Sequence, residues 1–266
     1  MKYATLKLDS RGAVEILSLN RPQALNALSP EMAGEITDYF DGLKHRLDVR
    51  VIVLKAEGRH FCAGADLGTD AFAEPGSGRA QRQMAMQKIY SGIVRAMRTC
   101  PQPIIALIHG AACGGGFSLA LACDVRYATP DARMNAAYIR VGLGGCDMGA
   151  GYLLPRLVGL SCASEFLLSG RFIEADRALR MGLVSDVVPT ETLLDTGLGL
   201  AQDMLKAAPM GLRMTKESIS AEMDAPSLEA ALMIEDRQQV ILIDTDDHRE
   251  AVKAFREKRA PVYRDA

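Results

Sequence analysis

The chain has 266 residues, of which 48% are hydrophobic and 24% charged, and its formal net charge is -2. This length and composition are typical of a globular protein that buries a full core. The near-neutral charge excludes the basic surface of a nucleic-acid-binding protein, and the absence of Trp, with aromatic residues at 5%, argues against a base-stacking surface.

The cysteines and histidines give no sign of a metal site. Six cysteines are scattered without a C-x-x-C pair, and the four histidines are dispersed. A zinc site needs clustered ligands, so we expect no metal. Scattered cysteines indicate a reducing compartment. Residues 1–8 alternate like a strand and lack the apolar segment of a signal peptide. We therefore expect a cytoplasmic protein.

The first elements that the sequence predicts are a hairpin and a helix. Leu6–Leu8 and Ala13–Leu19 flank a turn, as in a β-hairpin. Ser29 and Pro30 then supply an N-cap and a favourable first helical residue. We expect this helix to run to about Leu47.

Two later β-branched runs are each followed by a glycine-rich loop. Val51–Leu54 precedes the loop Gly58–Leu67, and Ile104–Ile108 precedes the loop His109–Ser118. Each loop is expected to open a helix, whose first backbone N–H groups have no partner within the helix. Small residues let a ligand approach such groups closely. Two of these donors converging on one oxygen would form an oxyanion hole.

Two stretches have alternative interpretations. Pro103–Cys123 carries no charge and contains a G-x-x-x-G spacing, but Gly114–Gly116 would break a membrane-spanning helix. We expect a buried strand, loop and helix there, and no membrane contact. Asp66–Arg82 is rich in Gly, Ala, Pro and Ser. It is expected to be a surface loop, either a lid or a tolerated insertion.

The C-terminal part is predicted to be helical from Leu193 onwards. Pro226–Glu229 begins one helix, and Asp244–Asp247 begins the last, which Pro261 ends. Before this region, strands and helices alternate in units that fit either a coiled superhelix of sheet or a doubly wound α/β sheet.

Four ordered motifs resemble those of the crotonase family, also called the enoyl-CoA hydratase/isomerase family. They are Leu19–Ser29, Phe61–Leu67, Pro103–Ala128 with its triple glycine, and Ala254–Pro261. The resemblance spans nearly the whole chain. It implies an α/β fold of the ClpP/crotonase type, a superhelical spiral of strand–strand–helix units. Residues 1–195 would form the spiral core with the CoA site, and residues 196–266 a C-terminal helical region that builds homotrimers or dimers of trimers (hexamers).

The resemblance also implies a substrate and a site. An acyl-CoA thioester would bind, with coenzyme A as part of the substrate and no permanently bound cofactor. The thioester carbonyl would lie between the backbone amides of Ala65 and Gly115. The positions that match CoA-binding residues are Ala63, Ala65, Asp66 and Leu67, together with Phe255 and Lys258, which would reach the nucleotide from a neighbouring subunit.

The acid–base positions depart from the family pattern. Ser118 and Tyr138 stand where the resemblance places the two glutamates of hydratases. Such groups typically contribute about 10²–10⁴-fold each, so efficient hydration is not expected. Asp147 lies in a loop one residue longer than that of hydratases and resembles an aspartate of dienoyl-CoA isomerases. It either moves a proton or caps the next helix, expected over Ala150–Leu157.

These features favour an isomerase or other lyase-type reaction, in which Ala65 and Gly115 hold a thioester enolate and Asp147 moves the proton. One alternative is a CoA-thioester hydrolase that uses Ser118 or a water activated by Asp147. Another is a non-catalytic acyl-CoA-binding protein. Tyr138 either orients or protonates the substrate, or is a core contact. A dinucleotide-dependent dehydrogenase is disfavoured because no G-x-G-x-x-G opens a helix after a strand.

Overall fold

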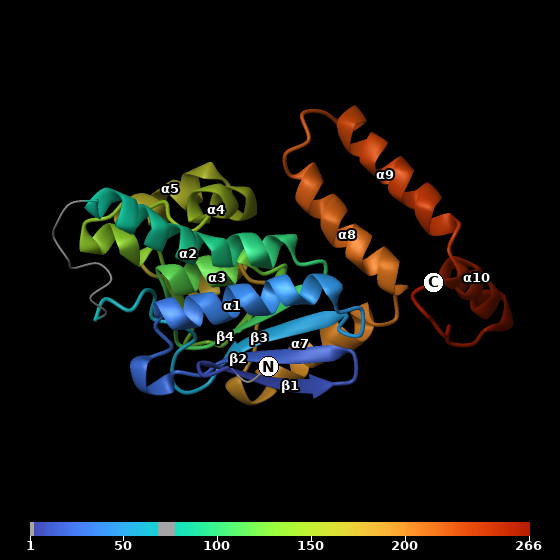
Figure 1. The fold of residues 1–266 in the computed structure, drawn as a ribbon, viewed down its shortest axis with the longest axis horizontal. Helices are drawn as coiled ribbons and strands as arrows, with labels where there is room; N and C mark the ends of the chain where they lie inside the picture. Colours follow the sequence, from blue (N-terminus) through green and yellow to red (C-terminus); the bar gives the residue numbers. More distant parts are fainter. Residues whose placement is uncertain (1–2, 69–77) are drawn as a thin grey trace.

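The computed structural model describes residues 3–68 and 78–266. Its main layer is a six-stranded sheet with the spatial order β1-β2-β3-β4-β6-β9. Figure 1 labels the first four of these strands. The strands are Leu6–Arg11 (β1), Val14–Leu19 (β2), Val51–Ala56 (β3), Ile104–Ile108 (β4), Val125–Ala128 (β6) and Asp186–Val187 (β9). β1 and β2 form the predicted antiparallel hairpin, and each later neighbour pairs in parallel.

A second layer of short strands turns the chain into a spiral. Its strands pair in the order β5 (Ala111–Cys113), β7 (Arg133–Asn135) and β8 (Ile173–Glu174). Isolated bridges, Leu28 to Ala65 and Cys62 to Ala112, extend this layer. The chain thus passes from a strand of the main sheet into the short layer and then into a helix, as in β4, β5 and α3 (Gly115–Ala122). This is the predicted superhelix of strand–strand–helix units, not a doubly wound sheet.

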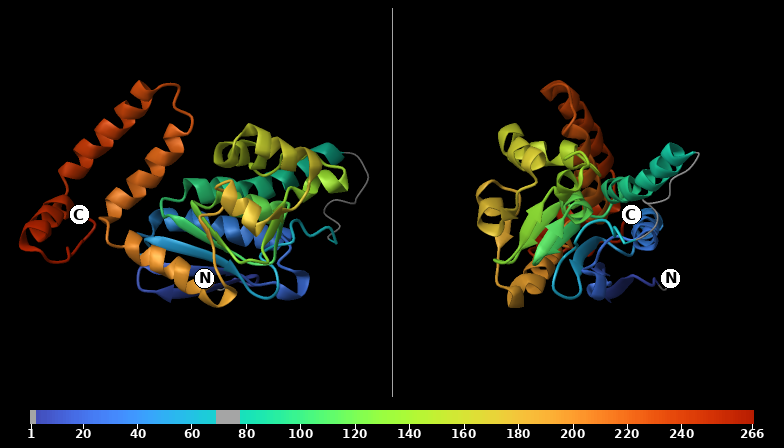
Figure 2. Two further views of the ribbon diagram at one scale, coloured as in Figure 1. Left: turned by 180° about the vertical axis from the view of Figure 1, so that it is seen from behind. Right: turned by 90° about the vertical axis from the view of Figure 1, so that its left-hand side faces the viewer.

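Helices cover both faces of the main sheet (Figures 1 and 2). α1 (Pro30–Gly42), α2 (Arg79–Thr99) and α3 pack on one face, and α7 (Thr190–Met204) packs on the other. Side chains of β3 alternate between them: Leu54 points into the larger core and Val53 into the core beneath α7. Burial of both faces explains the unbroken apolar runs of the central strands.

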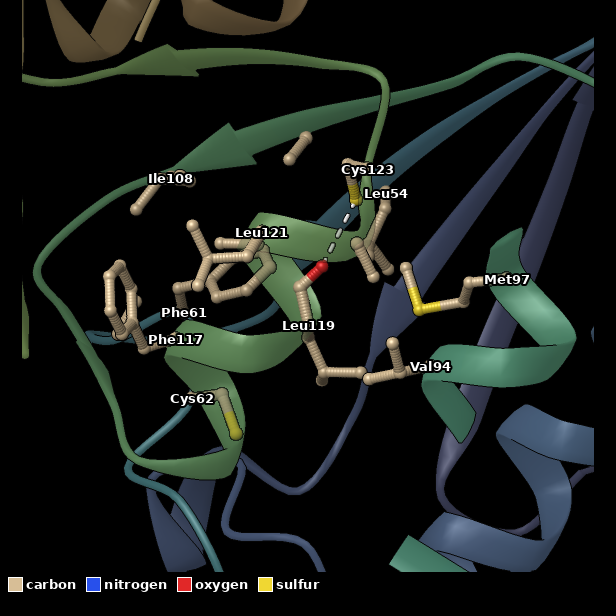
Figure 3. Close-up of a cluster of buried hydrophobic side chains, with 14 of the residues drawn as sticks. Leu54, Phe61, Cys62, Val94, Met97, Ile108, Phe117, Leu119, Leu121 and Cys123 are labelled. Atoms are coloured by element: carbon tan, nitrogen blue, oxygen red, sulfur yellow. Dashed lines mark hydrogen bonds between the residues drawn. The ribbon is translucent and has the colours of Figure 1, made fainter. Parts of the chain in front are cut away.

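The larger core fixes the two glycine-rich loops relative to each other. Phe61, from the first loop, and Phe117, from the start of α3, are both fully buried in it (Figure 3). The thiol of Cys123, at the other end of α3, donates to the Leu119 carbonyl at 3.3 Å. The loops are therefore held together by side-chain packing as well as by the bridge from Cys62 to Ala112.

α1 begins where the sequence predicts. The Ser29 hydroxyl accepts a hydrogen bond from the Met32 amide at 3.1 Å, and Pro30 is the first helical residue. The regular helix ends at Gly42, and the turn Leu43–His45 (η2) continues it as a 3-10 helix. The helix is therefore shorter than expected, because glycine is a poor helix former and the chain tightens there.

Short helices complete the core: one directly follows β2, and the others come after β7 in the chain. They are Pro22–Ala24 (η1), Ala137–Val141 (η4), Ala150–Val158 (α4), Leu160–Ser169 (α5) and Ala175–Arg180 (α6). α4 agrees with the predicted helix over Ala150–Leu157.

Three C-terminal helices project from the core as an arm (Figures 1 and 2). They are α8 (Pro209–Glu222), α9 (Leu228–Ile243) and α10 (Asp246–Glu257). The predicted caps are present, since Ser227 accepts from the Ala230 amide at 3.2 Å and Thr245 from the His248 amide at 3.1 Å. The expected division between residues 195 and 196 falls inside α7, which packs on the sheet, so the projecting arm begins at α8.

The loop expected over Asp66–Arg82 contains residues 69–77, which lie outside the described residues, and its lid interpretation stays a prediction. Its expected end is wrong, because residues 79–82 already form the first turn of α2. None of the helices in the described ranges is long and apolar enough to cross a membrane. Within the same ranges, no three His, Cys, Asp or Glu side chains group in a way that could hold a metal ion.

Candidate active site

The two glycine-rich loops bring the backbone amides of Ala65 and Gly115 together. A Cβ built on Gly115 lies 3.8 Å from the Ala65 nitrogen, and a Cβ built on Gly64 lies 3.6 Å from the Gly115 nitrogen. The neighbouring bridge uses the Leu28 amide, which donates to the Gly64 carbonyl at 2.7 Å. Because N–H groups alternate along an extended chain, the Ala65 N–H points away from that bridge.

The Gly115 amide is free for a different reason. Gly115 is the first residue of α3, so its N–H has no partner within the helix. In the described part of the chain, neither this amide nor that of Ala65 donates a hydrogen bond. Gly115 begins α3, as expected for the second loop, whereas Ala65 lies in an isolated bridge and begins no helix. Two adjacent free donors, one of them at a helix N-terminus, are suited to hold a developing negative charge on a carbonyl oxygen.

Each glycine of the triplet is required for its own reason. Gly114 has φ 51° and ψ -118°, a conformation that side-chain-bearing residues avoid. A Cβ on Gly115 would lie 2.8 Å from Leu28 Cδ1 and 3.2 Å from Met148 Sδ. A Cβ on Gly116 would lie 2.4 Å from the Cys62 carbonyl oxygen. The triplet therefore shapes the space around the two amides as well as the packing of α3.

Ser118 and Tyr138 form a buried hydrogen-bonded pair. Their hydroxyl oxygens are 2.7 Å apart, and the Ser118 hydroxyl donates to the main-chain carbonyl of Asp147 at 3.1 Å. A serine hydroxyl has one proton, so Tyr138 must be the donor to Ser118. Burial raises the pKa of Tyr138 and keeps its phenol protonated at neutral pH. The pair thus braces the loop that carries Asp147.

The carboxylate of Asp147 is anchored through one oxygen. Its Oδ1 accepts from the Met148 amide at 2.7 Å and from the side-chain amide of Gln87 on α2. Among the described residues no hydrogen bond to Oδ2 is found. Gly149 is the N-cap residue of α4, and no side chain caps that helix. The Asp147 side chain therefore does not cap α4, and the interpretation of Asp147 as its N-cap residue is wrong.

The family model for enoyl-CoA hydratase/isomerase matches residues 9–266, almost the whole chain. The chain belongs to the enoyl-CoA hydratase/isomerase family. This confirms the crotonase resemblance. The family acts on CoA thioesters, which is consistent with an acyl-CoA substrate for this chain. The two amides that lie close together in the structure, those of Ala65 and Gly115, are the ones for which the crotonase resemblance predicts an oxyanion hole.

Some similar proteins are named hydratases and others isomerases. A Mycobacterium leprae protein named probable enoyl-CoA hydratase echA12 is 37% identical over 259 residues, covering 96% of this chain and 88% of the relative. The 1,2-epoxyphenylacetyl-CoA isomerase of Escherichia coli K12 is 32% identical over 250 residues, covering 94% of each chain. The crystal structure of an enoyl-CoA hydratase from Bacillus anthracis matches with a TM-score of 0.92 at 31% identity, covering 98% of this chain and 100% of that chain.

The residues predicted to bind CoA lie in two separate places. The first place is the loop around Ala65, which also holds Ala63, Asp66 and Leu67. Ala63 and Asp66 are half-buried, and Leu67 lies at the surface with 65% of its area exposed. The Asp66 carboxylate pairs with Arg21 at 3.0 Å. Phe255 and Lys258 lie at the end of α10, in the arm (Figure 1). Within a single chain, the residues of the Ala65 loop and those at the end of α10 lie apart (Figure 1).

Sequence reasoning missed three residues that shape the site. Leu28 and Met148 line the space beside Gly115, and Gln87 binds Asp147. Leu28 lies within the N-terminal motif and Met148 directly follows Asp147, so their positions could have indicated a role. Gln87 lies 60 residues from Asp147 in the chain and has no motif around it. Only the packing of α2 against the Asp147 loop reveals it.

Proposed function

We propose that this protein catalyses isomerase-type or related lyase chemistry on an acyl-CoA thioester, beginning with removal of a proton next to the thioester carbonyl. The amides of Ala65 and Gly115 hold the enolate oxygen, and Asp147 accepts the proton and returns it. One carboxylate suffices to move a proton between two carbons of the same substrate. Decarboxylation is a related reaction that also forms a thioester enolate. It needs the two amides to hold the enolate oxygen, but it does not need Asp147 to move a proton.

The observation that carries this proposal is one anchored carboxylate, that of Asp147, in a loop whose Met148 side chain lies next to Gly115. Ser118 and Tyr138 stand where the crotonase resemblance places the two hydratase glutamates. Met148 links the carboxylate to Gly115. Its amide binds the Asp147 carboxylate, and its sulfur would lie 3.2 Å from a Cβ on Gly115. Ser118 and Tyr138 bind each other, so they supply no second general base for attack by water.

The hydrolase alternative receives less support from the contacts of Ser118. A serine nucleophile needs a base to take its proton. The hydrogen-bond partners of the Ser118 hydroxyl are a phenol and a main-chain carbonyl, and neither takes up a proton at neutral pH. A water activated by Asp147 is the remaining route to hydrolysis, and product analysis distinguishes it.

The test is incubation of the protein with trans-3-octenoyl-CoA in D₂O. We expect deuterium at the α-carbon by NMR and a rise in the absorbance of the conjugated 2-enoyl thioester. With trans-2-octenoyl-CoA we expect little hydration. Rapid hydration without exchange would contradict the proposal. Release of free CoA would indicate a hydrolase, and binding without exchange a non-catalytic acyl-CoA-binding protein.

We further infer that the arm joins copies of this chain into a homotrimer or a dimer of trimers. No residue of α9 is buried, and it exposes large apolar side chains, among them Val240 (67% exposed) and Ile243 (57%). Apolar surface of this kind is typical of a protein interface. The 82% exposed Phe255, with Lys258, would then complete the CoA site of a neighbouring subunit.

We expect the purified protein to sediment with the mass of three or six chains, and the variant Val240→Glu with Ile243→Glu to sediment as a smaller species. Two carboxylates within an apolar contact would lose their hydration without gaining partners. Gln239→Glu, which adds charge to an exposed residue of the same helix, is the control and should keep the assembly. A monomeric unmodified protein would refute the inference.

We also infer a cytoplasmic location. All six cysteines are free in the structure, which suits a reducing compartment.

A further inference from the structure

We propose that Gln87 is a positioning residue, which holds the Asp147 carboxylate in the orientation that exposes one oxygen to the substrate. The inference rests on the proposed function, because it concerns the proton-transfer group of that reaction. Gln87 lies in the middle of α2 and donates its side-chain Nε2–H to Asp147 Oδ1. It is a neutral residue that does not itself exchange a proton.

Two donors converge on the same carboxylate oxygen. The Met148 amide reaches Oδ1 at 2.7 Å from within the loop, and Gln87 reaches it from a separate helix. The torsion angle that turns an aspartate carboxylate has broad, shallow minima, so one local donor does not fix the plane of the group. A second donor from another direction does. With Oδ1 bound twice, Oδ2 is the oxygen that remains for the substrate.

The backbone of Asp147 is held independently of Gln87. Its carbonyl accepts from the Ser118 hydroxyl at 3.1 Å and from the Ala150 amide at 2.8 Å. Ser118 in turn is bound to the buried Tyr138. Removing the Gln87 side chain should therefore leave the loop in place and free only the carboxylate. This separation makes the role of Gln87 testable apart from the folding of the site.

Gln87 is exposed in the isolated chain, and Asp147 is half-buried. Water can therefore replace part of the lost hydrogen bond, and the effect of a substitution will be smaller than loss of the carboxylate itself. Misorientation of a reacting group by about 1 Å can cost about 10²-fold in rate. With solvent compensation, we expect a decrease of about tenfold.

The experiment compares Gln87→Leu and the nearly isosteric Gln87→Glu, which keeps the size of the side chain and removes the donor. The readouts are the α-proton exchange rate of trans-3-octenoyl-CoA at saturation and the dissociation constant for octanoyl-CoA. We expect exchange to fall about tenfold in Gln87→Leu and further in Gln87→Glu, whose charge repels the Asp147 carboxylate. The dissociation constant should change by less than about twofold.

Gln81→Leu is the matched control, because Gln81 is an exposed glutamine of the same helix. It should exchange at the unmodified rate. Asp147→Asn separates the two hypotheses: if it retains exchange, the proposed function fails. If it loses exchange and Gln87→Leu keeps the full rate, only the positioning role is overturned. Equal losses of rate and affinity in Gln87→Leu would also overturn it, because they indicate damage to binding.

Discussion

Replacing Asp147 by Asn is expected to abolish most α-proton exchange, with a loss of about 10²–10⁴-fold at saturating trans-3-octenoyl-CoA. The carboxamide keeps the size of the side chain and can still contact the Met148 amide through its oxygen. It cannot accept a proton at neutral pH, and no second carboxylate stands at Ser118 or Tyr138 to replace it. The rate should therefore fall while affinity for octanoyl-CoA is kept.

The appropriate comparison is Asp176→Asn, because Asp176 is an exposed aspartate of α6 that pairs with Arg180 on the surface. That variant should exchange at the unmodified rate. Proton exchange that persists in Asp147→Asn would show that another group, or the thioester alone between the two amides, is responsible. A large loss of affinity would instead assign Asp147 to binding.

Much of the fold was accessible from the sequence because local signals and long-range packing agree. Ser29, Ser227 and Thr245 predict helix starts, and each side chain makes the expected cap in the structure. The β-branched runs become central strands that are buried on both faces. The second layer of short strands was less visible, since it includes single-residue bridges that leave no alternation to detect.

Some residues of the candidate site could likewise be predicted from the sequence, and others are revealed only by the structure. The glycine-rich loops after buried strands indicated an oxyanion hole, and the match of four ordered motifs to the crotonase family assigned it to the amides of Ala65 and Gly115. The relation of Ser118, Tyr138 and Asp147 was not predicted: the sequence places them far apart and does not show that they form one hydrogen-bonded chain. Gln87 is harder still, because its role depends on how α2 lies against the Asp147 loop.

Gly115→Ala should cause the other large loss, about 10²–10³-fold in exchange, the range seen when one oxyanion-hole donor is removed. The added Cβ would lie 2.8 Å from Leu28 Cδ1, 3.2 Å from Met148 Sδ and 3.8 Å from the Ala65 nitrogen. Both closest atoms are ends of flexible side chains, so the protein can fold by moving them. The methyl group and the displaced side chains then occupy the space beside the two amides.

Gly199→Ala is the matched control, since a Cβ at that position of α7 meets nothing within 4 Å. Alanine favours a helix over glycine, so this variant should unfold at the same or a slightly higher temperature and keep its exchange rate. If Gly115→Ala folds and still exchanges at the unmodified rate, the oxygen is not held at these amides. Because Met148 also binds Asp147, a shift of its side chain could disturb the carboxylate too. A double variant with Asp147→Asn would then lose less than the sum of the two single effects.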